Sequence, residues 1–212
     1  MDFVVLTAFL GTAVALTLAP GPDILFVTAQ SIARSAKAGI VTACGLCTGL
    51  LVHITAAAVG ISAVIYQSSL AFSIVKYAGA LYLLYLAWQA FRNRETASLT
   101  NQEKTDLPYA GLYKKGILMN LLNPKVSLFF LALLPQFTNT SSGPVTLQML
   151  LLGVLFLLQA FIIFSVVSLL AHQAGRILQN NPKVSRRMNL VQGTLFTVIG
   201  LQMVVMENEG SF

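Results

Sequence analysis

Long apolar segments alternate with short polar connections along the whole chain. Each apolar segment has about the 20 residues that an α-helix needs to cross the hydrocarbon core of a bilayer, or more. This pattern predicts an all-α integral membrane protein with six transmembrane helices. The predicted spans are residues 3–33, 39–66, 70–91, 116–134, 145–171 and 188–206, and the connections are 34–38, 67–69, 92–115, 135–144 and 172–187.

Lys and Arg are distributed unevenly among these connections. The first connection contains two of them, the third five and the fifth four, whereas the second and fourth contain none. Short loops rich in Lys and Arg stay on the cytoplasmic side during membrane insertion. The odd-numbered connections are therefore predicted to be cytoplasmic, and both termini are predicted to face outward.

The composition supports membrane insertion and removes one competing class of protein. Hydrophobic residues make up 56% of the 212 residues and charged residues only 9%, whereas soluble domains carry roughly 25% charged residues. The net charge of +6 could indicate nucleic-acid binding, but the basic residues lie mainly in short loops between apolar segments. Their placement indicates orientation in a lipid bilayer, and no nucleic-acid partner is expected.

The third connection is the only long one and divides the chain into two parts. We predict a single membrane domain over residues 1–212, with halves 1–92 and 116–206 joined by the cytoplasmic linker 93–115. Three spans per half is an odd number, so two related halves would have opposite orientations in the membrane. Inverted three-helix repeats of this kind are common among transporters.

The first apolar segment is too long for one straight span. Its 31 residues would form a helix of about 46 Å, against a hydrocarbon core of about 30 Å. Pro20, Gly21 and Pro22 predict a break within it, because proline lacks an N–H and glycine permits unusual backbone angles. Pro124 predicts a similar disruption in the fourth span. Broken backbone at membrane depth requires surrounding protein or a water-filled cavity.

Four ionisable side chains fall within the predicted spans: Asp23, His53, Lys76 and Lys125. A charge at the bilayer centre costs roughly 2.5–3.5 kcal/mol on insertion scales, so such groups usually serve a function. Asp23 follows the proline break, where a restarted helix would favour a carboxylate at its N-terminus. It is interpreted as a ligand for a substrate ammonium or as a proton carrier. A helix cap near the cytoplasmic surface is the alternative.

Lys125 lies near the middle of the fourth span, too deep for its ammonium to reach the interface easily. Pro124 precedes it and frees the carbonyl one turn earlier, at Asn120, from its helical hydrogen bond. Asn123 adds a second amide nearby. We therefore predict that Lys125, Asn120 and Asn123 contribute to substrate binding or translocation.

The two other ionisable groups leave alternatives open. His53 shares one helix face with Gly45, Gly49 and Ala57, so it is predicted to point into the bundle. There it could be a structural hydrogen-bonding group or take part in substrate or proton transfer. Lys76 could extend outward to the interface or face another helix.

The remaining chemistry in the sequence points away from an enzyme. Cys44 and Cys47 form a C-x-x-C pair inside an apolar segment, where cysteine usually packs as a small hydrophobic residue. A redox role for them is kept as an alternative. Two histidines and no Walker-type loop give no support for a metal, another cofactor or ATP hydrolysis. Catalytic triad or H-E-x-x-H spacing is also missing from the sequence.

Four motifs resemble the LysE/RhtB superfamily of amino-acid exporters. They are APGPD at 19–23, GLCTG at 45–49 followed by Gly60, KYAGALYLLYLAW at 76–88, and NLLNPK at 120–125. The resemblance implies efflux of amino acids or close derivatives, such as homoserine, threonine, lysine or leucine. It also implies proton-driven antiport across the bacterial plasma membrane. The C-x-x-C pair is not part of this resemblance.

The residues and the resemblance favour the same function. An amino-acid zwitterion needs one anionic and one cationic partner, and Asp23 and Lys125 supply both from the corresponding helix of each half. We therefore predict a secondary transporter, with mutual pairing of the two side chains when no substrate is bound. A membrane redox protein using Cys44 and Cys47, a scaffold and a passive channel are the alternatives. The sequence leaves homo-oligomerisation open.

Overall fold

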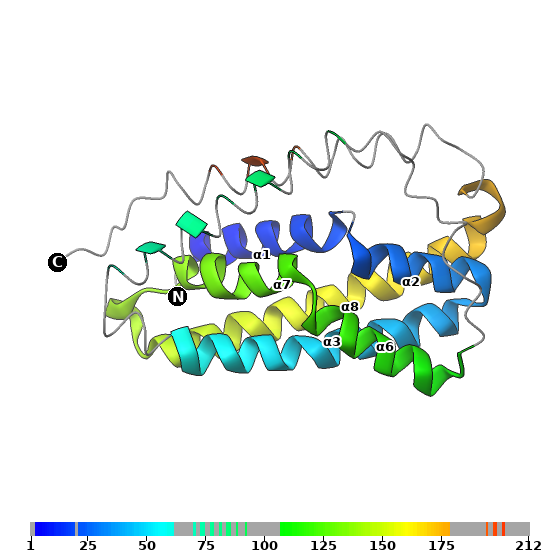
Figure 1. Ribbon diagram of the computed structural model, residues 1–212. Coiled ribbons are helices and arrows are strands. Elements are labelled where there is room, and N and C mark those ends of the chain that lie inside the picture. The colour runs from blue at the N-terminus through cyan, green and yellow to red at the C-terminus, as the bar shows by residue number, and fades with distance from the viewer. Residues whose placement is uncertain are drawn as a thin grey trace.

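The computed structural model of the chain describes residues 3–19, 21–61 and 107–178, with isolated positions between 70 and 92 and between 194 and 201. All regular structure in this described part is helical (Figure 1). The α-helices are α1 (Phe3–Leu18), α2 (Pro22–Ala33), α3 (Ala36–Ala56), α6 (Tyr109–Leu121), α7 (Pro124–Leu128) and α8 (Val145–Leu178). The π-helical turns are η1 (Ala57–Ile61) and η2 (Phe129–Leu133), and the 3₁₀ turns are η3 (Leu134–Phe137) and η4 (Thr140–Ser142).

These elements account for up to four membrane spans in the described part of the chain. Two are continuous helices, α3 with η1 and α8. The other two are bent pairs: α1 and α2 meet at 56°, and α6 meets the segment that begins with α7 at 48°. They correspond to the first, second, fourth and fifth predicted spans. The third and sixth predicted spans, 70–91 and 188–206, lie largely outside the described residues.

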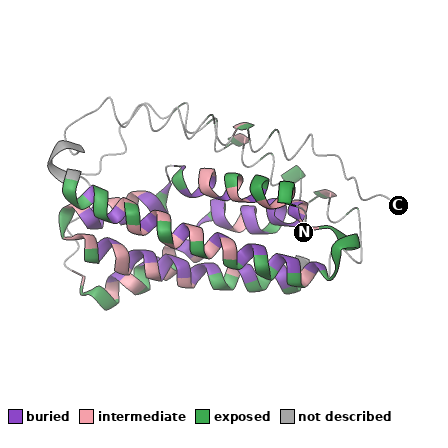
Figure 2. Cartoon of the chain, turned by 180° about the vertical axis from the view of Figure 1, so that it is seen from behind, coloured by how far each residue is buried: buried purple, intermediate pink, exposed green. Residues whose placement is uncertain are grey.

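The spans run in alternating directions (Figure 1). The pair α1–α2 and the pair α6–α7 run antiparallel to each other, and α3 runs antiparallel to α8. Buried residues line the sides of the helices that face one another, and exposed residues lie on the outer sides (Figure 2). The core contains a group of tilted and edge-on buried rings, Phe9, Phe129, Phe130 and Phe156.

The crossing of α3 and α6 depends on two glycines. A Cβ on Gly45 would lie 2.1 Å from the main-chain oxygen of Tyr113, and one on Gly116 would lie 2.6 Å from that of Thr42. Both distances are far below van der Waals contact, so the two backbones touch directly. This confirms the prediction that the small-residue face of α3, which also carries His53, packs inside the bundle.

Two helices extend beyond the apolar segments that predicted them. The helix α6 begins at Tyr109, ahead of the apolar segment at 116, and α8 continues to Leu178 instead of ending near 171. At 34 residues, α8 is about 51 Å long, well beyond the roughly 30 Å hydrocarbon core. Apolar composition marks where lipid begins, whereas main-chain hydrogen bonding decides where the helix ends.

Candidate functional site

The first helix break lies between α1 and α2. The helix α1 ends at Leu18 and α2 begins at Pro22, with Gly21 as an extended N-cap. Pro22 suits the first helical position because an N–H there would have no helical partner. The predicted break is therefore confirmed at Gly21 and Pro22, and Pro20 lies outside the described residues.

The second break, between α6 and α7, is built in a similar way. Pro124 opens α7, and Asn123 is its N-cap. The Asn123 side-chain oxygen accepts a hydrogen bond from the Lys125 main-chain N–H at 3.0 Å. This contact fixes the side-chain amide orientation of Asn123 and explains why an asparagine stands before the proline. The predicted disruption at Pro124 is confirmed.

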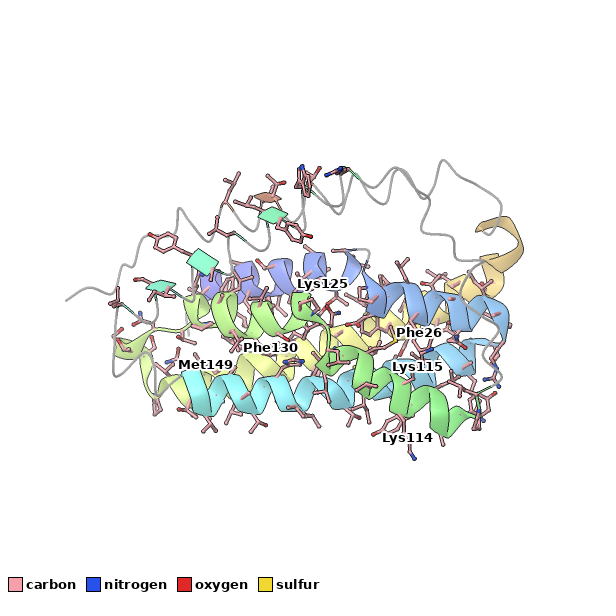
Figure 3. All side chains as sticks on the ribbon, in the orientation of Figure 1. Phe26, Lys114, Lys115, Lys125, Phe130 and Met149 are labelled. Carbon is pink, nitrogen blue, oxygen red and sulfur yellow. The ribbon has the colours of Figure 1, made fainter. Side chains whose placement is uncertain are left out.

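The two breaks meet through Lys125. Its Nζ donates to the main-chain oxygens of Leu16 at 3.1 Å and Ala19 at 3.2 Å. Leu16 has no helical donor for its carbonyl, because residue 20 is proline, and the ammonium takes that place. A Cβ on Gly21 would lie 3.1 Å from the same Nζ. Figure 3 shows Lys125 at the point where α7 passes the end of α1.

His53 binds a main-chain carbonyl at the second break, as Lys125 does at the first. Its Nε2 lies 3.2 Å from the main-chain oxygen of Asn120, which also accepts from the Asn123 main-chain N–H at 3.0 Å. Because a carbonyl can only accept, Nε2 carries the proton in this contact. The imidazole also stacks on Phe130, with ring centroids 6.0 Å apart. The Asn120 carbonyl is therefore occupied from within the chain, by His53 and by the Asn123 main-chain N–H.

Asp23 lies in the first turn of α2, next to this crossing. Its side chain is 3% exposed, and the Asn120 Nδ2 donates to one carboxylate oxygen at 3.3 Å. Ten residues separate Asp23 from the end of α2 at Ala33, which is about 15 Å along the helix. That depth is near the centre of a hydrocarbon core of about 30 Å. It favours an intramembrane role for Asp23 over a cap at the surface.

Asp23 and Lys125 lie close enough for their charges to interact, but their hydrogen bonds go elsewhere. Lys125 binds carbonyls of α1, and Asp23 binds the amide of Asn120. The expected direct ion pair between Asp23 and Lys125 is therefore not formed, and each charged group is hydrogen-bonded to a different partner. Each charge holds a polar group of the opposite half of the chain.

Three buried polar atoms at the crossing have no hydrogen-bond partner at close range, although the Asn123 amide lies near enough to Asp23 to stabilise its charge. They are the acceptors Asp23 Oδ1 and Asn120 Oδ1 and the donor Asn123 Nδ2. Buried polar groups without a partner are uncommon and costly. Two free acceptors beside a carboxylate suit an ammonium, and a free amide N–H near Lys125 suits a carboxylate. The site can therefore accept a small zwitterion.

One polar residue at the crossing was not expected from the sequence. Gln159 of α8 donates from Nε2 to Thr17 Oγ1 at 2.9 Å, next to the carbonyl of Leu16 that holds Lys125. Its Oε1 has no partner. The available signal was a lone amide inside a long apolar segment, where an unpaired polar group is unfavourable. Unlike Asn120 and Asn123, Gln159 has no proline or ionisable residue near it in the sequence to single it out.

The other predicted candidates are not part of this crossing. Lys76 lies outside the described residues. Cys44 and Cys47 are free cysteines on α3, and Cys47 is buried within coulombic range of Asp23. In the described part of the chain, no three His, Cys, Asp or Glu side chains gather as metal ligands.

Two broken helices that bring buried charges together near the bilayer centre define a multi-pass membrane transporter. Residues 14–207 match the family described as LysE type translocator. The chain belongs to this family. The prediction of this membership, and of a transporter instead of an enzyme, is confirmed.

Curated relatives cover nearly the whole chain. A Vibrio cholerae protein described as an uncharacterized membrane protein is 36% identical over 204 residues, 95% of this chain and 97% of the relative. The homoserine/homoserine lactone efflux protein of Salmonella typhimurium is 33% identical, over 91% of this chain and 92% of its own. The leucine efflux protein of Salmonella choleraesuis is 26% identical, over 94% of each chain. No solved structure shows significant similarity to the chain.

Proposed function

We propose that this transporter exports amino acids or close derivatives and binds them where its two helix breaks cross. The observation that carries the proposal is the set of three buried polar atoms without partners, two acceptors and one donor. They lie beside an anion, Asp23, and a cation, Lys125, each almost completely buried. A zwitterion satisfies all of these groups at once, which an uncharged solute or a simple ion does not.

The substrate ammonium is assigned to Asp23 and Asn120, and the carboxylate to Lys125 and Asn123. In the structure Lys125 donates to two carbonyls of α1. A substrate carboxylate is a stronger partner than a carbonyl, because both groups of the new hydrogen bond are charged. Substrate binding would thus draw Lys125 away from α1 and loosen the contact between the two breaks.

The named relatives support a substrate with an α-ammonium group. One is named for homoserine and its lactone and another for leucine. The lactone has no free carboxylate, so the ammonium is the group that all three compounds share. Asp23 is therefore assigned the contact common to all substrates, and Lys125 the contact that distinguishes free acids from lactones.

Export is proposed to be coupled to the proton gradient of the bacterial plasma membrane. Protonation of Asp23 would remove the charge that holds the ammonium, so that a proton and a substrate compete for one carboxylate. The Lys and Arg residues of the odd-numbered connections support an orientation with both termini outside. The antiparallel course of α1–α2 and α6–α7 (Figure 1) supports six transmembrane helices in two inverted halves, 1–92 and 116–206, joined by the linker 93–115.

The test is transport in liposomes that contain the purified protein. Radiolabelled leucine or homoserine should exchange across the membrane, and an imposed pH gradient should drive net accumulation that a protonophore abolishes. A passive channel would equilibrate the substrate without responding to the gradient. Failure to transport any of a broad set of amino acids and derivatives would overturn the proposal.

A further inference from the structure

A contact between an aromatic ring and a cation joins α2 and α6 on the basic side of the substrate site. The Lys115 Nζ lies 4.9 Å from the centroid of the Phe26 ring. Figure 3 shows Lys115 on the side of α6 that faces α2, whereas Lys114 points away. Phe26 follows Asp23 by three residues, so both side chains lie on one face of α2.

We propose that Phe26 and Lys115 form the cytoplasmic gate of the transport path, and that the cation over the ring holds this gate closed. The inference rests on the proposed function and on the orientation that places Lys115 on the cytoplasmic side. An exporter must admit substrate to Asp23 from that side and then seal the route. Phe26 is 2% exposed and lies along α2 between Asp23 and the basic connection.

The packing around Phe26 allows it to move without disturbing the main core. Phe26 forms a small apolar cluster with Ala38 and Leu112, separate from the large cluster that fills the rest of the bundle. The helix α2 packs extensively on α3 and α8 but only sparsely on α6. Of these three neighbouring helices, α6 therefore makes the least extensive contact with α2.

The helix breaks supply the hinges for such an opening. The segment α2 begins at one break and has 12 residues, while α6 ends at the other and has 13. Both segments lie on the same side of the two breaks, and α6 runs toward its break while α2 runs away from its own (Figure 1). Rotation at either break separates Phe26 from Lys115 without unwinding a helix.

A second set of cation contacts lies beyond Phe26, where α6 begins and α2 ends. The Arg34 guanidinium donates to the main-chain oxygen of Leu107. Arg34 and Lys37 also lie over the Tyr109 ring, 5.5 and 5.1 Å from its centroid. These contacts tie the connection between α2 and α3 to the start of α6. Once released from the rings, the same cations would attract the carboxylate of an entering substrate.

Cys47 provides a reporter that is already present in the chain. The chain has two cysteines, so Cys44→Ala leaves Cys47 as the sole thiol. Cys47 is buried and within coulombic range of Asp23, which places it on the substrate side of Phe26. The experiment measures its labelling by a membrane-impermeant maleimide in inside-out vesicles, where the reagent reaches the cytoplasmic face.

Lys115→Gln should raise the labelling rate about two- to five-fold, the range that corresponds to a partly exposed cation–π contact. Lys114→Gln is the matched control and should leave the rate unchanged. Phe26→Leu should raise labelling as well, and adding Lys115→Gln to it should cause no further rise, because the contact is already lost. Equal rates for the Lys115→Gln and Lys114→Gln proteins would overturn the gate, whether or not Phe26→Leu folds.

The gate and the proposed function are tested by different assays, so either can be shown to be wrong without the other. Labelling of Cys47 needs no substrate, whereas liposome transport needs no reporter. If Lys115→Gln does not alter labelling but the wild-type protein accumulates amino acids, the gate alone is wrong. If labelling changes as expected but no amino acid is transported, the gate remains and the proposed substrate is wrong.

Discussion

The Nε2 of His53 lies 3.2 Å from the main-chain oxygen of Asn120, one helical turn before Pro124. Lys125 Nζ lies 3.1 Å from the main-chain oxygen of Leu16, one turn before residue 20, which is also proline. At Leu16 the Lys125 side chain supplies the donor that proline cannot, and at Asn120 the His53 side chain adds a second donor to the main-chain N–H of Asn123. The breaks are thus fixed by the same interactions that bring charged groups to the substrate site.

The His53 contact predicts that an N–H donor is required at this position. His53→Gln keeps an N–H and should retain export with an unchanged pH profile. His53→Leu removes one of the two donors to the Asn120 carbonyl, which should cost about 0.5–1.5 kcal/mol of stability. Thermal unfolding in detergent and pH-dependent flux in liposomes measure the two effects. Loss of proton-driven transport in a stable His53→Gln protein would contradict a role limited to hydrogen-bond donation.

The close approach of α3 and α6 predicts a strong effect of a single methyl group. Gly45→Ala places a Cβ 2.1 Å from the Tyr113 carbonyl oxygen, so the two helices must separate. We expect destabilisation of about 1–3 kcal/mol or more. Gly11→Ala is the matched control, since a Cβ there meets nothing within 4 Å. Similar unfolding temperatures for the two variants would contradict the crossing seen here.

The cysteine pair is predicted to be dispensable for transport. Cys44 and Cys47 are free thiols on one helix, and the substrate site makes no hydrogen bond through either of them. The double variant Cys44→Ala with Cys47→Ala should export at the wild-type rate under both oxidising and reducing conditions. Loss of export in a normally folded double variant would revive the redox alternative.

The sequence alone predicts the breaks because their cause is local. Proline lacks an N–H wherever it stands, so Pro22 and Pro124 mark the ends of helices without knowledge of the fold. The burial of His53 also follows from its own helix, through the spacing of Gly45 and Gly49. Both features lie within one element.

The hydrogen-bond partners of the buried groups cannot be predicted from one helix, because they depend on which helices pack together. Helical spacing gives the face on which Lys125 lies but not the segment opposite it. Lys125 was expected to pair with Asp23, and it binds α1 carbonyls instead. The contact of Gln159 with Thr17 and the ring–cation contact of Phe26 with Lys115 have no signature within a single element, so only the fold reveals them.

The central claim is that Asp23 and Lys125 act together on one substrate, and removing either charge tests it. Asp23→Asn keeps the size of the side chain, and Lys125→Met keeps most of its length. Each variant loses a charged hydrogen bond to substrate, about 1.5–3 kcal/mol, or about ten- to hundred-fold in flux. Both proteins should still reach the membrane in amounts comparable to the wild type.

The most direct measurement is proton-driven amino-acid flux by these two variants and the wild-type protein, reconstituted side by side in liposomes. The account predicts that Asp23→Asn and Lys125→Met each reduce flux at least about tenfold. It also predicts that the Asp23→Asn protein no longer responds to the pH gradient. Near wild-type, gradient-driven flux in both variants would show that neither residue carries the substrate, which would contradict the account.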